Sequence, residues 1–271
     1  MVSIVTINLN NKSGLIKTIE SVLSQTCSDV EFIVIDGGSS DGSKDVLINY
    51  SDHLSYSISE PDNGIYNAMN KGILKATGSY CLFLNSGDYF YADESLDTLL
   101  RNSGDVDLVY GDLMVVSKGH STRREYPGEL SFDFFYRGES LPHAATLIKT
   151  SLFVSHGMYE EDFKIVSDWA FFLKAMMDTR VTYRHVNETI VVFDGHGISA
   201  NKDNSDQMKR EREMVLSRYK FFVPDYRHLN DQKKRLLEVE RSFLHRVAEL
   251  INTSWVWNFF KKIKRWFKFM V

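Results

Sequence analysis

Hydrophobic and polar positions follow two alternating spacings through the N-terminal third of the chain. Runs rich in β-branched residues are typical of strands, and between them apolar residues recur every three or four positions, as in helices. Leu15, Ile19 and Val22, for example, fall on one helical face. The pattern predicts strands at 3–8, 31–36, 54–59 and 79–84, separated by helices at 15–23, 43–49 and 65–76. This alternation is typical of an α/β fold whose parallel sheet is covered by helices.

The pattern becomes mixed after Asp88, which we interpret as a second half of the same domain. It predicts strands near 108–116, 144–148, 181–186 and 189–193, and a helix near 168–177. A polar stretch at 199–206 precedes helical patterns at 207–222 and 231–251. We therefore expect a main domain at 1–205, a helical appendix at 206–252 and a terminal helix at 253–271.

Composition narrows the class of protein. The 271 residues are 43% hydrophobic and 25% charged, enough for a sizeable core, and the net charge of −4 argues against a nucleic-acid partner. Cys27 and Cys81 lack the spacing of a disulfide framework or a zinc site. No run approaches the roughly 18 apolar residues of a membrane span, and the first residues lack signal-peptide features. A cytoplasmic location is expected.

Four carboxylates lie at or near the ends of successive predicted strands. Open α/β sheets bind ligands beyond the carboxyl ends of their strands, and converging carboxylates need a cation or hydrogen-bond donors among them. The residues are Asp36, Asp41, Asp62 and Asp88. They predict a nucleotide site with a hard divalent cation, Mg²⁺ or Mn²⁺. The alternative is that Asp and Gly only supply turns here.

Four ordered segments carry a resemblance to a known family. Residues 3–8, 34–43, 59–72 and 82–88 resemble a family 2 glycosyltransferase of the GT-A fold, and bacterial enzymes of O-antigen, capsule and colanic-acid assembly in particular. The resemblance implies an αβα sandwich with a mixed sheet, here with a C-terminal helical extension. It also implies inverting transfer of a sugar from a UDP- or GDP-linked diphospho-sugar to an acceptor hydroxyl.

The resemblance assigns the donor site residue by residue. Asp36 matches the aspartate that hydrogen-bonds the base, and Gly37 stands where the family usually has a second aspartate. For Gly64 and Asn70, local roles in helix start and packing stay open. The donor-binding residues implied are Thr6, Asn8, Asp36, Asp62, Asn63, Gly64, Asn70, Asn85 and Ser86.

The metal motif departs from the family pattern. Where the family has Asp-x-Asp-Asp, this chain has Asn85-Ser86-Gly87-Asp88. We expect Asp88 to bind Mg²⁺ or Mn²⁺ with the diphosphate and waters completing the shell; weak metal dependence is the alternative. His196, in a glycine-rich loop after a predicted strand, is a further candidate ligand of metal or phosphate.

Asp168 is the candidate catalytic base. Inverting transfer needs one carboxylate to take the proton of the attacking hydroxyl, and Asp168 matches the last residue of the family's acidic pair, with Ser167 replacing the Glu. A helix N-terminal role is compatible with this one. His143 is assigned to acceptor binding, with an ordinary strand-entry histidine as the alternative.

The last seventeen residues predict a membrane-surface helix. Wound as a helix, Trp255–Val271 places apolar side chains opposite Lys261, Lys264, Arg265 and Lys268. We therefore expect peripheral attachment to the anionic inner face of the cell membrane and a lipid-linked glycan acceptor in surface-polysaccharide assembly. A core or dimer helix is the alternative for this segment.

Two other functions compete with this hypothesis. The replacements at Gly37, Gly87 and Ser167 are compatible with a non-catalytic module that binds nucleotide sugars or glycans. A nucleotidyltransferase is disfavoured because residues 8–12 contain no glycine-rich triphosphate loop.

Overall fold

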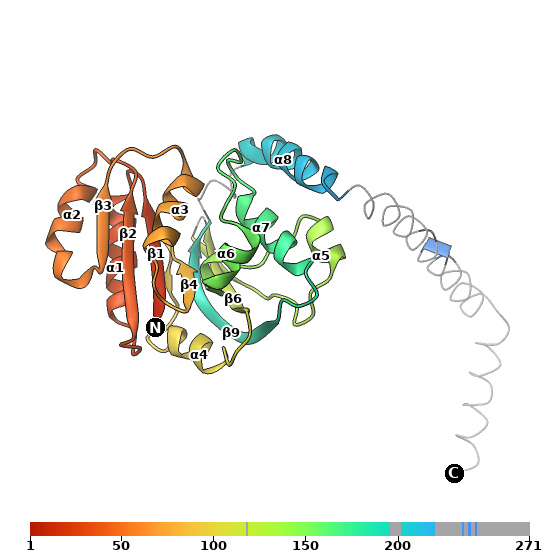
Figure 1. Cartoon of the computed structure of the whole chain (residues 1–271), viewed down its shortest axis with the longest axis horizontal. Helices are drawn as coiled ribbons and strands as arrows, with labels where there is room; N and C mark the ends of the chain where they lie inside the picture. Colours follow the sequence, from red (N-terminus) through yellow and green to blue (C-terminus); the bar gives the residue numbers. More distant parts are fainter. Residues whose placement is uncertain (118, 196–201, 220–234, 236–237, 240–241, 243–271) are drawn as a thin grey trace, which may run out of the picture. The chain divides into compact units, whose positions relative to one another are not determined.

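The computed structural model describes residues 1–117, 119–195 and 202–219, with residues 235, 238, 239 and 242. Its N-terminal half is built on parallel strands (Figure 1). β1 (Val2–Asn8) pairs in parallel with β2 (Val30–Asp36) and β4 (Tyr80–Phe83), and β3 (Tyr56–Ser59) continues the sheet beyond β2. The connecting helices are α1 (Lys12–Leu23), α2 (Ser43–Asn49) and α3 (Ile65–Lys75). The predicted alternation is confirmed.

Close packing of α3 on the sheet depends on a glycine. All seven residues of β1 are buried, the polar Ser3, Thr6 and Asn8 included, as expected for a central strand covered on both faces. Gly72 of α3 faces Val5 of β1 so closely that a Cβ at residue 72 would lie 2.3 Å from Val5 Cγ1. The helix can therefore approach the centre of the sheet only because this side chain is absent.

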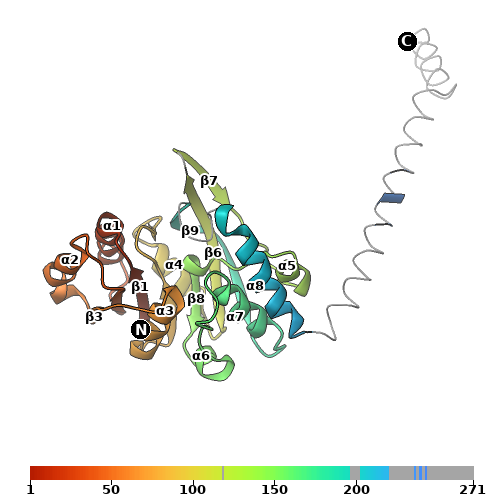
Figure 2. The same cartoon turned by 90° about the horizontal axis from the view of Figure 1, so that it is seen from above.

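The C-terminal half completes a mixed sheet. β6 (Leu108–Ser117) pairs in parallel with β9 (Tyr183–Asp194) and antiparallel with β7 (His120–Arg124) and β8 (Thr146–Lys149); β8 joins the two halves by pairing with β4. β5 (Tyr89–Phe90) borders β9, giving the order β3-β2-β1-β4-β8-β6-β9-β5 among the described residues. Figure 2 shows the β6–β7 hairpin extending beyond the body of the sheet. The two strands predicted at 181–186 and 189–193 are one strand, β9.

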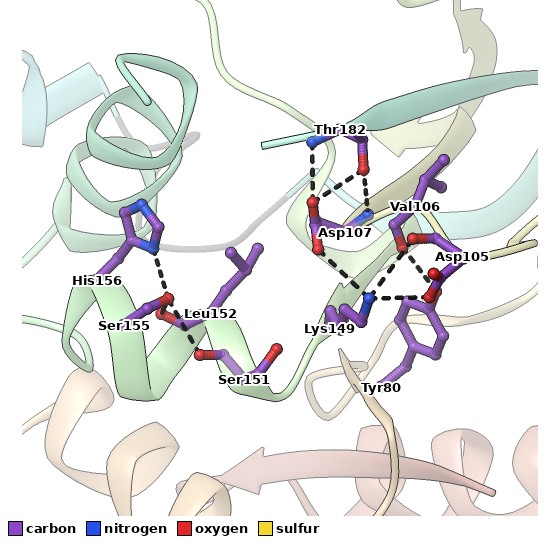
Figure 3. A network of polar contacts seen from close by, with 10 residues as sticks. All are labelled: Tyr80, Asp105, Val106, Asp107, Lys149, Ser151, Leu152, Ser155, His156 and Thr182. Carbon is purple, nitrogen blue, oxygen red and sulfur yellow. Dashed lines mark hydrogen bonds and ion pairs between the residues drawn. The ribbon is translucent and has the colours of Figure 1, made fainter. Parts of the chain in front are cut away.

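Polar contacts hold together the edge of the sheet at which the parallel strands begin, opposite the edge that carries the predicted site. Lys149 Nζ lies 3.1 Å from Asp105 Oδ1 and 3.6 Å from Asp107 Oδ1, and Asp107 Oδ2 accepts hydrogen bonds from the Thr182 amide and hydroxyl (Figure 3). Tyr80, beside this network, pairs with Val2 at the start of β1. The network therefore joins β8, β6 and β9 at the amino ends of the parallel strands.

The remaining helices lie in the C-terminal half. They are α4 (Ser95–Arg101), α5 (Phe132–Tyr136), α6 (Ser151–His156), α7 (Ser167–Met176) and α8 (Ser205–Ser217), and a 3-10 turn, η2, spans His143–Ala145. The sequence pattern did not predict α4, α5 or α6; α5 and α6, with five and six residues, carry too few turns for a periodic signal.

The compact unit extends through Val215, past the boundary that the sequence placed at residue 205. α8 lies beside α7 in both views (Figures 1 and 2). Buried Glu211 accepts hydrogen bonds from the amides of Lys164 and Ile165, both at 3.0 Å. Residues 216–271 form a second unit. Most of the predicted helix at 231–251 and all of 253–271 lie outside the described residues, within which no helix is long and apolar enough to cross a membrane.

Candidate functional site

The carboxyl ends of β1, β2 and β3 meet at Asp36. In the sheet register Asn8 lies opposite Asp36, and Asp36 lies opposite Ser59. The Asp36 carboxylate is fully buried and accepts hydrogen bonds from Asn8 Nδ2 at 2.6 Å, Ser59 Oγ at 2.6 Å and the Ser39 amide at 3.0 Å. Ser39 Oγ donates a further bond to Asp36 Oδ1. The strand-end rule thus placed Asn8 and Asp36 together correctly.

The charge of Asp36 is fixed by these donors. Burial raises the pKa of the carboxyl, but the hydrogen bonds from Ser39, Ser59 and Asn8 outweigh burial and hold the pKa below its ordinary value. The group is therefore ionised at neutral pH. Since both of its oxygens are engaged within the chain, Asp36 orders the loop that follows β2.

Asp62 occupies the space beside Gly37. A Cβ at residue 37 would lie 2.4 Å from Asp62 Oδ2 and 3.3 Å from Leu9 Cδ1. Asp62 Oδ1 accepts a hydrogen bond from the Gly64 amide at 3.0 Å. Asp62 thus places its carboxylate where a side chain at 37 would stand. Leu9, which sequence reasoning missed, is 59% exposed at the end of β1, and its signal was an apolar residue in a polar loop.

The start of α3 is shaped by backbone geometry. Gly64 precedes the helix with φ 111°, a conformation that disfavours any other residue, and its missing side chain faces open space. The exposed Asn63 donates its amide to Asn67 Oδ1 at 3.2 Å. The backbone around residues 62–64 is thereby held open toward solvent.

Thr6 and Asn70 hold parts of the site in place. Thr6 is fully buried and donates to the Leu84 carbonyl at 2.7 Å, joining β1 to the segment after β4. Asn70 Nδ2 donates to the Tyr159 carbonyl and Glu161 Oε1, both at 2.9 Å, and Asn70 Oδ1 accepts the Tyr159 amide at 3.1 Å. The structure therefore places both side chains in contacts within the chain.

Asp88 and Asp194 form an acidic pair. Asp88 is 4% exposed and its Oδ1 accepts the Asp194 amide at 2.9 Å. Burial raises the pKa of Asp88 to about 7; the amide hydrogen bond opposes this shift and the Asp194 charge adds to it. Gly87, with φ 107°, lies beside Asp194, since a Cβ there would be 3.6 Å from Asp194 Oδ2. Sequence reasoning missed Asp194, although an acidic residue ending a strand was a usable signal.

The oxygens around Asp88 suit a hard divalent cation. Asn85 Oδ1 is buried without a hydrogen-bond partner among the described residues, and Asn85 and Ser86 lie in the turn that leads to Asp88. A metal held here would need ligands from a substrate, since no group of three or more His, Cys, Asp or Glu side chains able to hold a metal occurs in the part of the chain that the structure describes. His196 lies outside the described residues.

Asp168 lies in the first turn of α7 and is held by a tyrosine. Tyr66, buried on α3, donates to Asp168 Oδ1 at 2.9 Å. Ser167, which replaces the family's glutamate, is 1% exposed and accepts the Glu160 amide through its Oγ. The helix start is thereby tied both to α3 and to the preceding loop. Tyr66 lies within the family-like segment 59–72, but the resemblance assigned it no role.

His143 belongs to an aromatic cluster beside Asp168. Its Nε2 lies 2.7 Å from Tyr159 Oη, and its ring stacks on Phe83 with 4.7 Å between centroids. Burial lowers the pKa of His143, an effect that the Asp168 charge partly offsets. Tyr159 also contacts Tyr66, with ring centroids 5.7 Å apart. The structure thus brings together the predicted base and the predicted acceptor residue.

The comparisons identify the family. Residues 3–161 match the family model described as Glycosyl transferase family 2, and the chain belongs to this family. An uncharacterized glycosyltransferase of Mycobacterium tuberculosis is 35% identical over 210 residues, covering 75% of this chain and 79% of the relative. A PGL/p-HBAD biosynthesis glycosyltransferase of Mycobacterium bovis is 28% identical over 207 residues, covering 74% and 79%. The nucleotidyltransferase alternative is thereby excluded.

Solved structures confirm the GT-A fold. S. aureus TarS 1-349 in complex with UDP-GlcNAc has a TM-score of 0.63 at 16% identity, over 79% of this chain and 66% of that one. The mannosyltransferase PcManGT from Pyrobaculum calidifontis, in complex with GDP-Man and Mn²⁺, has a TM-score of 0.52 at 16% identity, over 71% and 56%. The chain spans 36% of a longer TarS chain. Family and fold together define the protein as a glycosyltransferase.

Proposed function

We propose that the protein is an inverting glycosyltransferase that moves a sugar from a UDP- or GDP-linked donor to a hydroxyl of a lipid-linked glycan in bacterial surface-polysaccharide assembly. The observation that carries the proposal is the Asp168 carboxylate, oriented by Tyr66 at the start of α7. A rigidly held carboxylate is what an inverting reaction needs from its base.

The donor site is assigned to the segments that follow β1, β2, β3 and β4. TarS and PcManGT, which share the fold, are described with UDP-GlcNAc and with GDP-Man. Asp62 is the carboxylate proposed to accept an N–H of the base, because its Oδ2 stands beside Gly37 and Asp36 is already engaged. Leu9 would supply apolar contact to the base. The proposed donor site is completed by Asn8, Asn63, Gly64, Asn85 and Ser86. Its supporting residues, which make contacts within the chain, are Thr6, Asp36 and Asn70.

A divalent metal is part of the proposal. Asp88 and Asp194 would hold Mg²⁺ or Mn²⁺, with His196 as a further ligand, and PcManGT is described in complex with Mn²⁺. When bound, the ion would neutralise charge on the departing diphosphate. The buried Asp88 carboxyl, with its pKa near 7, is suited to lose its proton when a cation arrives.

The reaction then follows from the placement of Asp168. Its carboxylate takes the proton of the acceptor hydroxyl while that oxygen attacks the anomeric carbon, and the bond from this carbon to the diphosphate oxygen breaks on the opposite face. Tyr66 keeps one carboxylate oxygen fixed. His143 and Tyr159 are proposed to line the acceptor side, since His143 feels the Asp168 charge.

The acceptor is proposed to lie at a membrane. The amphipathic, basic segment Trp255–Val271 would attach the enzyme to the inner face of the cell membrane, beside a lipid-linked glycan. Attachment can be measured by co-sedimentation with vesicles containing anionic lipid, comparing the full chain with a variant in which Lys261, Lys264, Arg265 and Lys268 are changed to Gln. Equal sedimentation of the two proteins would contradict the proposal.

Calorimetry combined with donor turnover tests the catalytic assignment. Wild type, Asp168→Asn and Asp162→Asn are titrated with UDP, GDP and their diphospho-sugars, with and without Mn²⁺, and donor hydrolysis is followed. Asp162 is an exposed neighbour and serves as the control. We expect one nucleotide class to bind all three proteins and turnover to be lost only in Asp168→Asn. Turnover by Asp168→Asn at the wild-type rate would refute the base, and binding without turnover by wild type would favour the non-catalytic module.

A further inference from the structure

Arg212 on α8 is a partly buried cation without a counter-ion in the part of the chain that the structure describes. Its guanidinium lies over the Trp169 ring, with 5.6 Å from Cζ to the centroid, and its Nε is buried without a hydrogen-bond partner. Among the described residues no carboxylate comes within ion-pair distance of it. Glu139, whose charge acts on Arg212, pairs instead with Arg124 at 2.7 Å.

The surrounding chain leaves room for this guanidinium and fixes its position. A Cβ at residue 138 would lie 2.4 Å from Arg212 Nη1, and the backbone there has φ 84°. Both the lack of space and the left-handed backbone therefore favour glycine at this position. The neighbouring Glu211 anchors α8 to the amides of Lys164 and Ile165, directly before α7. Arg212 is therefore held beside the helix that begins with Asp168.

An unpaired, partly buried guanidinium has a physical cost. Burial lowers the pKa of Arg212, and the charges of Asp168 and Glu139 only partly compensate. Arginine nonetheless stays charged, and its planar group of N–H donors matches the oxygens of phosphate. A bound phosphate would give the positive charge of the half-buried guanidinium a counter-ion.

We propose that Arg212 binds a phosphate group of the acceptor next to the hydroxyl that Asp168 deprotonates. The acceptor assignment rests on the proposed function, because it follows from the position of Asp168. It is favoured over the donor diphosphate because Arg212 contacts Trp169 and lies beside Gly138, whereas the proposed donor residues follow β1, β2, β3 and β4. Arg212 would then orient the acceptor for attack.

Fluorescence of Trp169 offers a direct test with inorganic phosphate and pyrophosphate as probes. The full-length protein is titrated with each probe, and Trp169→Phe identifies the part of the signal due to Trp169. We expect a saturable change in emission that Arg212→Gln weakens at least tenfold. Arg210→Gln, which removes an exposed arginine of the same helix, is expected to match wild type. Equal binding by Arg212→Gln and wild type would overturn the proposal.

Two further experiments test whether a lost signal comes from misfolding and whether the phosphate binds in the donor site. Gly138→Ala should displace the guanidinium and weaken the probe without removing the charge, and circular dichroism checks that each variant is folded. Repeating the titration with protein saturated by the nucleotide that binds distinguishes the sources of phosphate. A persisting signal supports an acceptor site, and a signal abolished by nucleotide assigns Arg212 to the donor and overturns the proposal. If Asp168→Asn keeps its turnover, Asp168 is not the catalytic base. That result would leave the measured phosphate binding by Arg212 unchanged.

Discussion

The Tyr66 hydroxyl donates a hydrogen bond to Asp168 Oδ1 over 2.9 Å, although 102 positions separate the two residues. Burial, and to a smaller extent the Asp168 charge, raise the pKa of Tyr66 well above its ordinary value. The phenol therefore remains a donor throughout the physiological pH range. The contact joins α3, which carries the second half of the family-like segment 59–72, to α7, which carries the candidate base.

Tyr66→Phe should lower kcat and leave donor affinity unchanged. The substitution removes the hydroxyl that orients the Asp168 carboxylate, and misplacement of a reacting group costs up to about 100-fold in rate; we expect about 10-fold to 100-fold here. Steady-state kinetics should show the loss in kcat rather than in donor KM. Tyr50→Phe is the matched control, because it removes an exposed Tyr–Glu20 bond. A Tyr66→Phe enzyme with wild-type kcat would mean that Asp168 needs no orientation by the phenol.

Asp88 should make the metal-free protein less stable as pH rises from about 4 to about 7. The folded-state pKa of Asp88, about 7, is above the unfolded value of 3.8, so the native state holds the extra proton in this window. The stabilising difference is complete below the unfolded pKa and is lost as pH rises through the folded one. Thermal melting of wild type and Asp88→Asn in EDTA measures it as a difference of a few kcal/mol at most.

Thermal melting with added Mn²⁺ tests whether Asp88 binds the cation. At pH 7.5 the ion should raise the melting temperature of wild type, because it compensates the charges of Asp88 and Asp194. Asp88→Asn should respond much less. If Mn²⁺ moves the two melting temperatures equally, the cation binds elsewhere.

Gly37→Ala should weaken nucleotide binding through Asp62. The new methyl would lie 2.4 Å from Asp62 Oδ2, so the carboxylate must rotate away and lose its bond to the Gly64 amide. We expect roughly tenfold weaker binding by calorimetry, equivalent to about 1.4 kcal/mol. In a double-mutant cycle, Gly37→Ala should have almost no further effect in an Asp62→Ala background. Additive losses would show that the two positions act independently.

Glu211→Ala should detach α8 from the loop before α7. It leaves the amides of Lys164 and Ile165 without their acceptor, and hydrogen bonds to charged groups contribute roughly 1.5 to 3 kcal/mol each. We expect the free energy of unfolding to fall by about 3 to 6 kcal/mol in urea denaturation. Glu213→Ala, at an exposed position on the same helix, should change it by less than about 0.5 kcal/mol. Equal effects would contradict an anchoring role for Glu211.

The periodicity of apolar residues predicted the elements whose one face or whole length is buried in the core. The buried run Val2–Asn8 and the helical spacing of Leu15, Ile19 and Val22 record which faces meet the core, and the structure confirms both elements. The pattern missed the short helix α6 and divided the long strand β9 into two predicted strands. A six-residue helix carries almost no periodicity, and the polar residues of β9 at its exposed positions interrupt its apolar pattern.

By itself, the sequence determined the α/β class, the order of the N-terminal elements and the placement of Asn8, Asp36 and Asp88 near strand ends. These follow from side-chain periodicity and from the rule that parallel strands end at one edge of a sheet. Only the tertiary structure decided that Tyr66 holds Asp168, that Asp62 fills the space beside Gly37 and that Arg212 lies over Trp169. Such contacts depend on packing between segments far apart in the chain, which no local pattern of residues specifies.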